Sequence, residues 1–156
     1  MNGMMAPQQA IGELRNCYQE YIEKYQELQA GLTVQDILAG WIGSGKVKEQ
    51  QAALYEEYAA KGQECVEILR IALDGCDPSE VSRWVEQGLE RILFYNQTDS
   101  DLNIMLIAME TLAEPLIPLL SKDATKEILT RYQKRTPKYR MLPNQSKILK
   151  LLKKNS

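Results

Sequence analysis

Apolar side chains recur at three- and four-residue steps near the start of the chain, and this spacing restricts the fold more than any other feature. The residues in this run are Ile11, Leu14, Tyr18, Tyr21, Tyr25 and Leu28. All of them fall along one face of an α-helix. Pro7 precedes the run, no further proline occurs before Pro78, and Gly31 suits a C-terminal cap. The pattern predicts a helix over 8–30.

Similar spacing and capping signals predict further helices in the middle of the chain. Thr33 is a candidate N-cap for a short helix that includes Trp41 and ends at a Gly43-Ser44-Gly45 turn. A longer helix is expected over about 46–74, with Gly62 inside it and Gly75 as its end. Asp77-Pro78-Ser79-Glu80 then combines an N-cap, a proline at the first helical position and an acidic third residue. These residues predict a helix that ends near Tyr95.

The remaining segment contains all the other prolines. Residues 102–120 are almost wholly apolar, which predicts a central helix that Pro115 and Pro118 kink or divide near Glu114. Ser121 or Asp123 is expected to cap a short helix that ends before Pro137. An extended connector should follow, and Ser146 should then cap a last amphipathic helix.

No segment alternates apolar and polar residues over the length of a strand. The fold class is therefore predicted to be all-α, a bundle of five or six helices with a proline-interrupted basic C-terminal segment. The sign of the charge also changes where the C-terminal segment begins. Residues 1–121 hold 8 Lys/Arg against 19 Asp/Glu, whereas residues 122–156 hold 11 against 2. We therefore describe 1–121 as an acidic helical body and 122–156 as a basic segment.

The basic segment is the main candidate for a binding site. Cations interleaved with aromatic residues are typical of proteins that bind single-stranded nucleic acid, because bases stack on rings while Lys and Arg neutralise phosphates. Four docking surfaces remain open: the protein's own acidic body, nucleic acid, another protein and, least favoured, an anionic membrane. The candidate stacking residues are Tyr132 and Tyr139, and the candidate anion-binding residues are Arg131, Lys134, Arg135, Lys138, Arg140, Lys147, Lys150, Lys153 and Lys154.

Tyrosines on two of the predicted helices form a second candidate surface. They are Tyr18, Tyr21, Tyr25, Tyr55 and Tyr58. Tyrosine favours half-exposed surfaces where its ring packs and its hydroxyl reaches a partner. This seam is interpreted first as a helix–helix contact within the chain, and alternatively as a homodimer interface or a groove for a partner protein.

The sequence contains no complete catalytic or metal-binding motif. The chain has no histidine, and Gly40–Lys46 matches a phosphate-binding loop only in part, because Val47 replaces the required hydroxyl. Carboxylate pairs such as Glu20/Glu23 and Glu64/Glu67 fit solvated helix faces better than magnesium sites. We predict no cofactor and no metal.

The cysteines and the termini favour a soluble cytoplasmic protein. Cys17, Cys65 and Cys76 are odd in number, lie far apart in the sequence and form no C-x-x-C pair. They are expected to be reduced thiols without a redox role. The chain shows neither a signal peptide nor a run of apolar residues long enough to span a membrane.

Three functions follow from these features. The first is a small non-enzymatic adaptor or regulator whose basic segment engages an anionic partner, with nucleic acid as one candidate. The second is a protein-binding inhibitor or chaperone-like module, such as a mobile-element accessory protein, that acts through the tyrosine seam. The third is a magnesium-dependent all-α nucleotide hydrolase.

Overall fold

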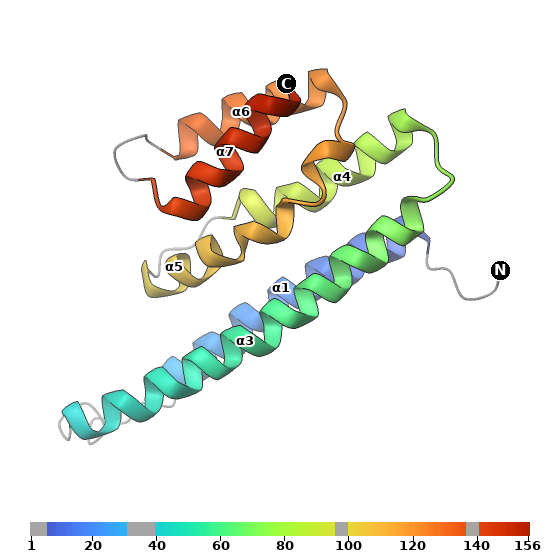
Figure 1. Cartoon of the computed structure of the whole chain (residues 1–156). Coiled ribbons are helices and arrows are strands. Elements are labelled where there is room, and N and C mark those ends of the chain that lie inside the picture. The colour runs from blue at the N-terminus through green and yellow to red at the C-terminus, as the bar shows by residue number, and fades with distance from the viewer. Residues whose placement is uncertain (1–5, 31–39, 96–99, 137–140) are drawn as a thin grey trace.

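The computed structural model describes residues 6–30, 40–95, 100–136 and 141–156 (Figure 1). Within these residues the chain is helical and contains no strand, which confirms the predicted all-α bundle. None of the described helices is both long enough and apolar enough to cross a membrane. The elements are α1 (Pro7–Ala30), α3 (Gly40–Leu73), α4 (Pro78–Leu93), α5 (Ser100–Ala108), the 3₁₀ turns η1 (Met109–Ala113) and η2 (Ile117–Leu119), α6 (Lys122–Arg135) and α7 (Pro143–Asn155).

The helices form three layers (Figure 1). The antiparallel α1–α3 hairpin is one outer layer, and the antiparallel α6–α7 hairpin is the other. Between them lie α4, α5 and the two 3₁₀ turns, with α4 against α1 and η1 against α3, α4 and α7. One continuous hydrophobic core runs through all three layers, from Leu14 on α1 to Leu152 on α7.

Tyrosines fill the contact between α1 and α3. Tyr18, Tyr21 and Tyr58 are each 0% exposed and Tyr25 is 1% exposed, whereas Tyr55 is half-buried. The Tyr21 ring lies 5.6 Å from the Tyr58 ring and 6.3 Å from the Tyr25 ring, in tilted arrangements that aromatic pairs favour. This packing accounts for the spacing of the apolar residues along α1.

The predicted boundary between α3 and α4 is confirmed. Gly75 has a φ of +89°, the left-handed conformation that favours glycine after the end of a helix. The Asp77 side chain accepts a hydrogen bond of 3.0 Å from the backbone N–H of Glu80, and Pro78 occupies the first turn of α4. Gly62 does not interrupt α3. It is buried, and a Cβ at this position would lie 2.6 Å from Cδ1 of Leu112 in η1, so glycine permits a close approach between the layers.

The start of α3 differs from the prediction. The turn expected at Gly43-Ser44-Gly45 is wrong, because these residues continue the helix that begins at Gly40. Each glycine costs a helix about 1 kcal/mol, and propagation along a helix that has already formed outweighs this cost. Trp41 belongs to α3, and the rest of the predicted short helix lies in 31–39, outside the described residues.

The apolar segment 102–120 divides earlier than predicted. The α-helix ends at Ala108, and the chain continues as 3₁₀ turns. Pro115 has no N–H to donate to the carbonyl of Thr111. That carbonyl accepts instead from the N–H of Glu114 at 3.1 Å. The donor lies three residues after the acceptor, as in a 3₁₀ helix, and not four residues after it, as in an α-helix. Two prolines three residues apart thus convert this part of the segment into tight turns.

Of the two helix caps predicted in the basic segment, the one for α6 is correct and the one for α7 is wrong. Ser121 caps α6 by accepting from the backbone N–H of Ala124 at 3.2 Å. The proposed Ser146 cap is wrong, because α7 begins three residues earlier, at Pro143. Proline suits the first position of a helix, and the side-chain oxygen of Gln145 accepts from the backbone N–H of Leu142 at 3.0 Å.

Candidate anion-binding face

The basic segment packs onto the middle layer through both of its described helices. Ile128 on α6 and Ile148, Leu149 and Leu152 on α7 are buried in the common core. Burial of each such side chain contributes about 1.5–3 kcal/mol. The α6–α7 hairpin is therefore part of the folded body.

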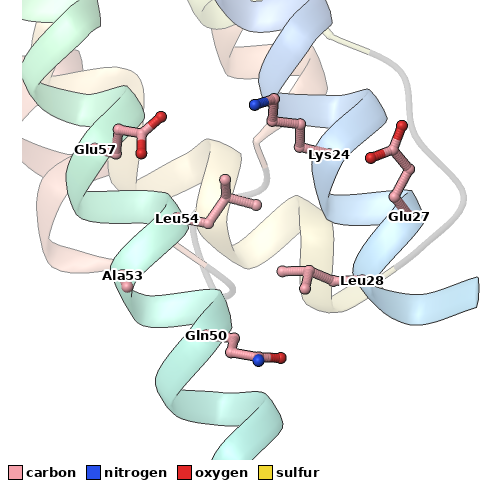
Figure 2. Close-up of a pocket in the computed structure, with 7 residues that line it drawn as sticks. All are labelled: Lys24, Glu27, Leu28, Gln50, Ala53, Leu54 and Glu57. Atoms are coloured by element: carbon pink, nitrogen blue, oxygen red, sulfur yellow. The ribbon is translucent and has the colours of Figure 1, made fainter. Parts of the chain in front are cut away.

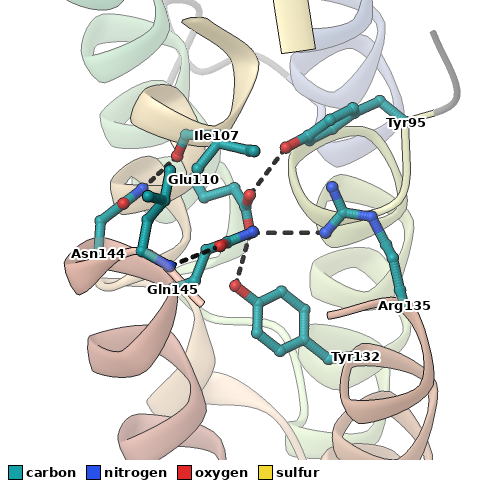
Figure 3. A network of polar contacts seen from close by, with 8 residues as sticks. Tyr95, Ile107, Glu110, Tyr132, Arg135, Asn144 and Gln145 are labelled. Atoms are coloured by element: carbon teal, nitrogen blue, oxygen red, sulfur yellow. Dashed lines mark hydrogen bonds and ion pairs between the residues drawn. The ribbon is translucent and has the colours of Figure 1, made fainter. Parts of the chain in front are cut away.

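A buried carboxylate links α6 and α7 to the middle layer (Figure 3). Glu110 of η1 is 0% exposed, and its two oxygens accept hydrogen bonds from the hydroxyls of Tyr95 at 2.8 Å and Tyr132 at 2.7 Å. The Arg135 guanidinium lies 3.7 Å from one of these oxygens, and the Gln145 side chain also hydrogen-bonds to the carboxylate. Glu110 thus has partners on α6, on α7 and at the end of α4.

Two opposing effects set the protonation of Glu110. Burial raises the pKa of its carboxyl group, whereas the hydrogen bonds from Tyr132 and Tyr95 and the charge of Arg135 lower it, and burial is the larger effect. Arg135 in turn lies 4.3 Å above the ring of Tyr95, a distance that suits a cation–π contact. The cluster is compact, shielded from solvent and built from side chains of four elements.

Three cations of the basic segment pair with carboxylates of the body. Arg135 pairs with Glu110, Arg131 forms a two-pronged contact with Glu90 of α4, and Lys147 lies 3.4 Å from Glu114. Arg131, Arg135 and Lys147 are among the predicted anion-binding residues, for which the protein's own acidic body is one of the four docking surfaces left open. In the structure they hold the hairpin in place, which matches the alternative in which the segment docks on its own acidic body.

Two asparagine side chains also attach α7 to the rest of the molecule. Asn155 donates to the carbonyl of Ile117 at 3.0 Å and to the Thr125 hydroxyl at 2.8 Å, and Asn144 donates to the carbonyl of Ile107. These bonds join α7 to the middle layer and to the Thr125 hydroxyl of α6. They lie at the two ends of α7 and therefore restrict its rotation.

The remaining described lysines of the segment face solvent. Among the described residues none of them forms an ion pair. Lys122 and Lys126 lie one turn apart on α6, and Lys150 and Lys153 lie one turn apart on the neighbouring α7. We call the exposed, unpaired lysines of these two helices the basic face, and they are Lys122, Lys126, Lys134, Lys150, Lys153 and Lys154.

The candidate aromatic residues do not add to the basic face in the described part of the chain. Tyr132 is 0% exposed and its hydroxyl is engaged by Glu110, so it is not placed to stack on a base. Tyr139, together with Lys138 and Arg140, lies outside the described residues. The basic face therefore offers charge, and its described residues offer no exposed aromatic ring.

The acidic side chains gather on the opposite layer. The exposed carboxylates of the α1–α3 hairpin are Glu13, Glu20, Glu23, Glu27, Glu49, Glu56, Glu57, Glu64 and Glu67. The middle layer separates them from α6 and α7 (Figure 1). The charge asymmetry of the sequence thus becomes a difference between two opposite faces of the molecule.

A cleft lies between α1 and α3 near one end of the hairpin (Figure 2). Its volume is about 460 Å³, and Leu28 and Leu54 point into the space between the helices. Lys24, Glu27 and Glu57 surround it with mixed charge. Tyr18, Tyr21, Tyr25 and Tyr58 are buried between the helices, which leaves Tyr55 as the one seam residue with substantial exposure.

The described residues hold no group of three acidic, cysteine or histidine side chains arranged to bind a metal ion. Glu20, Glu23, Glu64 and Glu67 are all exposed, and Glu67 pairs with Arg70 at 2.8 Å. No family model, no curated protein and no solved structure matches the chain.

Sequence reasoning missed the Glu110 cluster. The available signal was a carboxylate inside the most apolar segment of the chain, since a buried charge requires partners. Its partners Tyr95, Tyr132 and Gln145 lie between 15 and 35 positions away, and no local pattern connects them to Glu110.

Proposed function

We propose that the protein is a small non-enzymatic helical adaptor or regulator whose basic face binds an anionic polymer, with nucleic acid as the favoured class. The observation behind this proposal is the separation of the basic segment into two sets of cations. Arg131, Arg135 and Lys147 pair with the body, while the lysines of the basic face have no ion-pair partner among the described residues.

The packing of α6 and α7 on the body fixes the spacing of the backbone positions that carry these lysines, which favours binding to a regular anion. Phosphates along a nucleic acid strand attract a cluster of lysines, and binding releases the counterions that the strand had condensed. Because the described part of the basic face has no exposed aromatic ring, contact with phosphates is expected to dominate. The predicted binding is therefore tolerant of sequence and sensitive to salt.

The exposed carboxylates of the α1–α3 hairpin favour one orientation of the protein on a polyanion. A polyanion approaching the α1–α3 hairpin meets exposed carboxylates, whereas one approaching α6 and α7 meets lysines. The protein would bind with α6 and α7 against the polyanion, and the outer surface of α1 and α3 would remain free. This is the arrangement of an adaptor that binds on one side and presents another surface outward.

The test uses the full chain, because removal of α6 and α7 would expose the core. The variant Lys122→Gln/Lys126→Gln/Lys150→Gln/Lys153→Gln removes four charges from the basic face. A matched control, Arg15→Gln/Lys24→Gln/Lys61→Gln/Arg70→Gln, removes four exposed charges from α1 and α3. Affinity for fluorescent single-stranded and duplex DNA and RNA is measured at low salt. We expect at least a tenfold loss in the first variant and a smaller change in the control, and equal effects of the two variants would refute the proposal.

A further inference from the structure

One end of the α1–α3 hairpin extends beyond the middle layer (Figure 1). The middle layer packs against the other end of the hairpin, where a Cβ at Gly88 of α4 would lie 3.6 Å from Leu14 and 3.5 Å from Leu69. The cleft between α1 and α3 lies about four turns further along α1, at Leu28. Its lining comes from α1 and α3 alone, so no described side chain of the middle layer covers it.

The cleft is apolar at its centre. Leu28 and Leu54 are half-buried and point into the space between the two helices (Figure 2). Ala53, beside Leu54, is exposed, and its small side chain leaves the backbone of α3 accessible from the cleft. The volume of about 460 Å³ lies within the range of about 300–1,000 Å³ that is typical of ligand pockets. Two facing helices with leucines between them form a groove that suits the apolar side of a third helix.

The charges around the cleft restrict the kind of partner that it can bind. Within 20–28 and 49–61, the exposed carboxylates are Glu20, Glu23, Glu27, Glu49, Glu56 and Glu57. The exposed cations of the same ranges are Lys24 and Lys61, and Lys61 already pairs with Glu57 at 3.3 Å. A nucleic acid strand would be repelled here, and a second copy of the chain would bring the same excess of carboxylates. The surroundings of the cleft therefore favour a cationic partner.

We propose that this cleft binds a basic amphipathic helix of a partner protein. Apolar side chains of that helix would enter between Leu28 and Leu54, and its lysines or arginines would meet the surrounding carboxylates. The chain's own basic amphipathic helix, α7, is not available for this role, because its apolar side is buried in the core of the same molecule. The proposal goes beyond anion binding, since the cleft lies on the layer opposite the basic face.

The test measures the binding of fluorescent synthetic peptides to the full chain in the absence of nucleic acid. The first peptide has about 14 residues, or roughly four helical turns, with leucines on one face and lysines on the other. A second peptide carries glutamates in place of the lysines. A third has the composition of the first in an order that places leucines on every face. We expect the first peptide to bind, and the other two to bind at least about tenfold more weakly.

A matched pair of arginine variants locates the binding site. Ala53→Arg places a cation in the cleft, whereas Ala52→Arg adds the same charge at an exposed neighbour that does not line it. Because both alanines are exposed, neither variant disturbs the core. We expect Ala53→Arg to weaken binding of the lysine peptide at least about tenfold, and Ala52→Arg to weaken it by less than about threefold. Equal losses in the two variants, or no binding of this peptide by wild type, would overturn the proposal.

A second pair of variants tests the carboxylates. Glu27→Gln/Glu57→Gln neutralises the two that line the cleft, and Glu13→Gln/Glu64→Gln neutralises two exposed carboxylates at the other end of the hairpin. The total charge changes equally, so a larger loss of affinity in the first variant shows that the peptide lies at the cleft. The same loss in both would show that the peptide responds only to the net charge of the protein, which is incompatible with a defined site.

Two further measurements separate this site from the basic face and from self-association. The variant Lys122→Gln/Lys126→Gln/Lys150→Gln/Lys153→Gln should bind the lysine peptide at least as tightly as wild type does, whether or not the basic face binds nucleic acid. Sedimentation of the wild-type protein alone should show no association that Ala53→Arg abolishes. An association of that kind would mean that a second copy of the chain occupies the cleft, and it would overturn the proposal.

Discussion

At the scale of single residues, Glu110 is the most informative position in the molecule. A carboxylate that is wholly removed from water costs several kcal/mol unless its environment replaces the lost hydration. Here two tyrosine hydroxyls, a guanidinium group and an amide provide that replacement. Because these partners lie on α6, on α7 and at the end of α4, Glu110 fixes the docking of α6 and α7 on the body.

Replacement of Glu110 should therefore reduce stability strongly. We expect Glu110→Ala to lower the free energy of unfolding by about 3–5 kcal/mol, since it leaves Arg135 without its ion-pair partner and two tyrosine hydroxyls without their acceptor. Glu114→Ala is the control, because its partner Lys147 is exposed, and such a pair contributes at most about 1 kcal/mol. Urea unfolding followed by circular dichroism measures both changes. Similar losses in the two variants would contradict the assigned role.

The pH dependence of this contribution has a definite sign. Burial raises the pKa of Glu110 above its ordinary value of 4.5, so the folded protein binds this proton more tightly than the unfolded chain does. The stability that depends on Glu110 is then greatest below pH 4.5 and falls as pH rises through the folded-state pKa. The difference in unfolding free energy between wild type and Glu110→Gln should shrink over this window. A difference that grows with pH would show that the pKa is lowered.

At the scale of elements, the close approach of η1 to α3 depends on Gly62. The exposed side of α1 offers a comparison, because a Cβ at Gly12 would meet nothing within 4 Å, whereas one at Gly62 would collide with Leu112. Both glycines lie inside long helices, so their effect on helix propensity is similar.

The same substitution at these two glycines should have opposite effects. Gly12→Ala should raise the free energy of unfolding by about 0.5–1 kcal/mol through helix propensity alone. Gly62→Ala should lower it, because overpacking of a core costs about 1–3 kcal/mol. Chemical denaturation of the two single variants and of wild type tests this. An equal gain in both would mean that Leu112 moves aside without cost.

Most elements could be predicted from the sequence where a local signal determines them. The spacing along α1, the cap at Asp77 and the turn at Gly75 are such signals, and each is confirmed. The start of α3 could not be predicted, because propagation of a long helix outweighs two glycines. The early end of α5 was also missed, since it falls at Ala108, seven residues before Pro115, where no local signal marks it.

At the scale of the whole molecule, the fold turns a division of charge along the chain into a division between two faces. The order of charges along the sequence reveals the division but not which cations the body neutralises. Arg131, Arg135 and Lys147 find their partners on segments distant in the sequence, so only the fold separates them from the lysines of the basic face.

The salt dependence of nucleic acid binding tests the central claim most directly. The equilibrium constant for a single-stranded oligonucleotide is measured across a salt series for wild type, for the variant lacking Lys122, Lys126, Lys150 and Lys153, and for the α1–α3 control variant. Each phosphate contact contributes about −0.7 to the slope of log K against log salt concentration. We predict a steep linear decrease for wild type and the control, and a slope shallower by about 3 for the lysine variant. Parallel lines for the lysine variant and wild type, or no binding by wild type at low salt, would contradict the account.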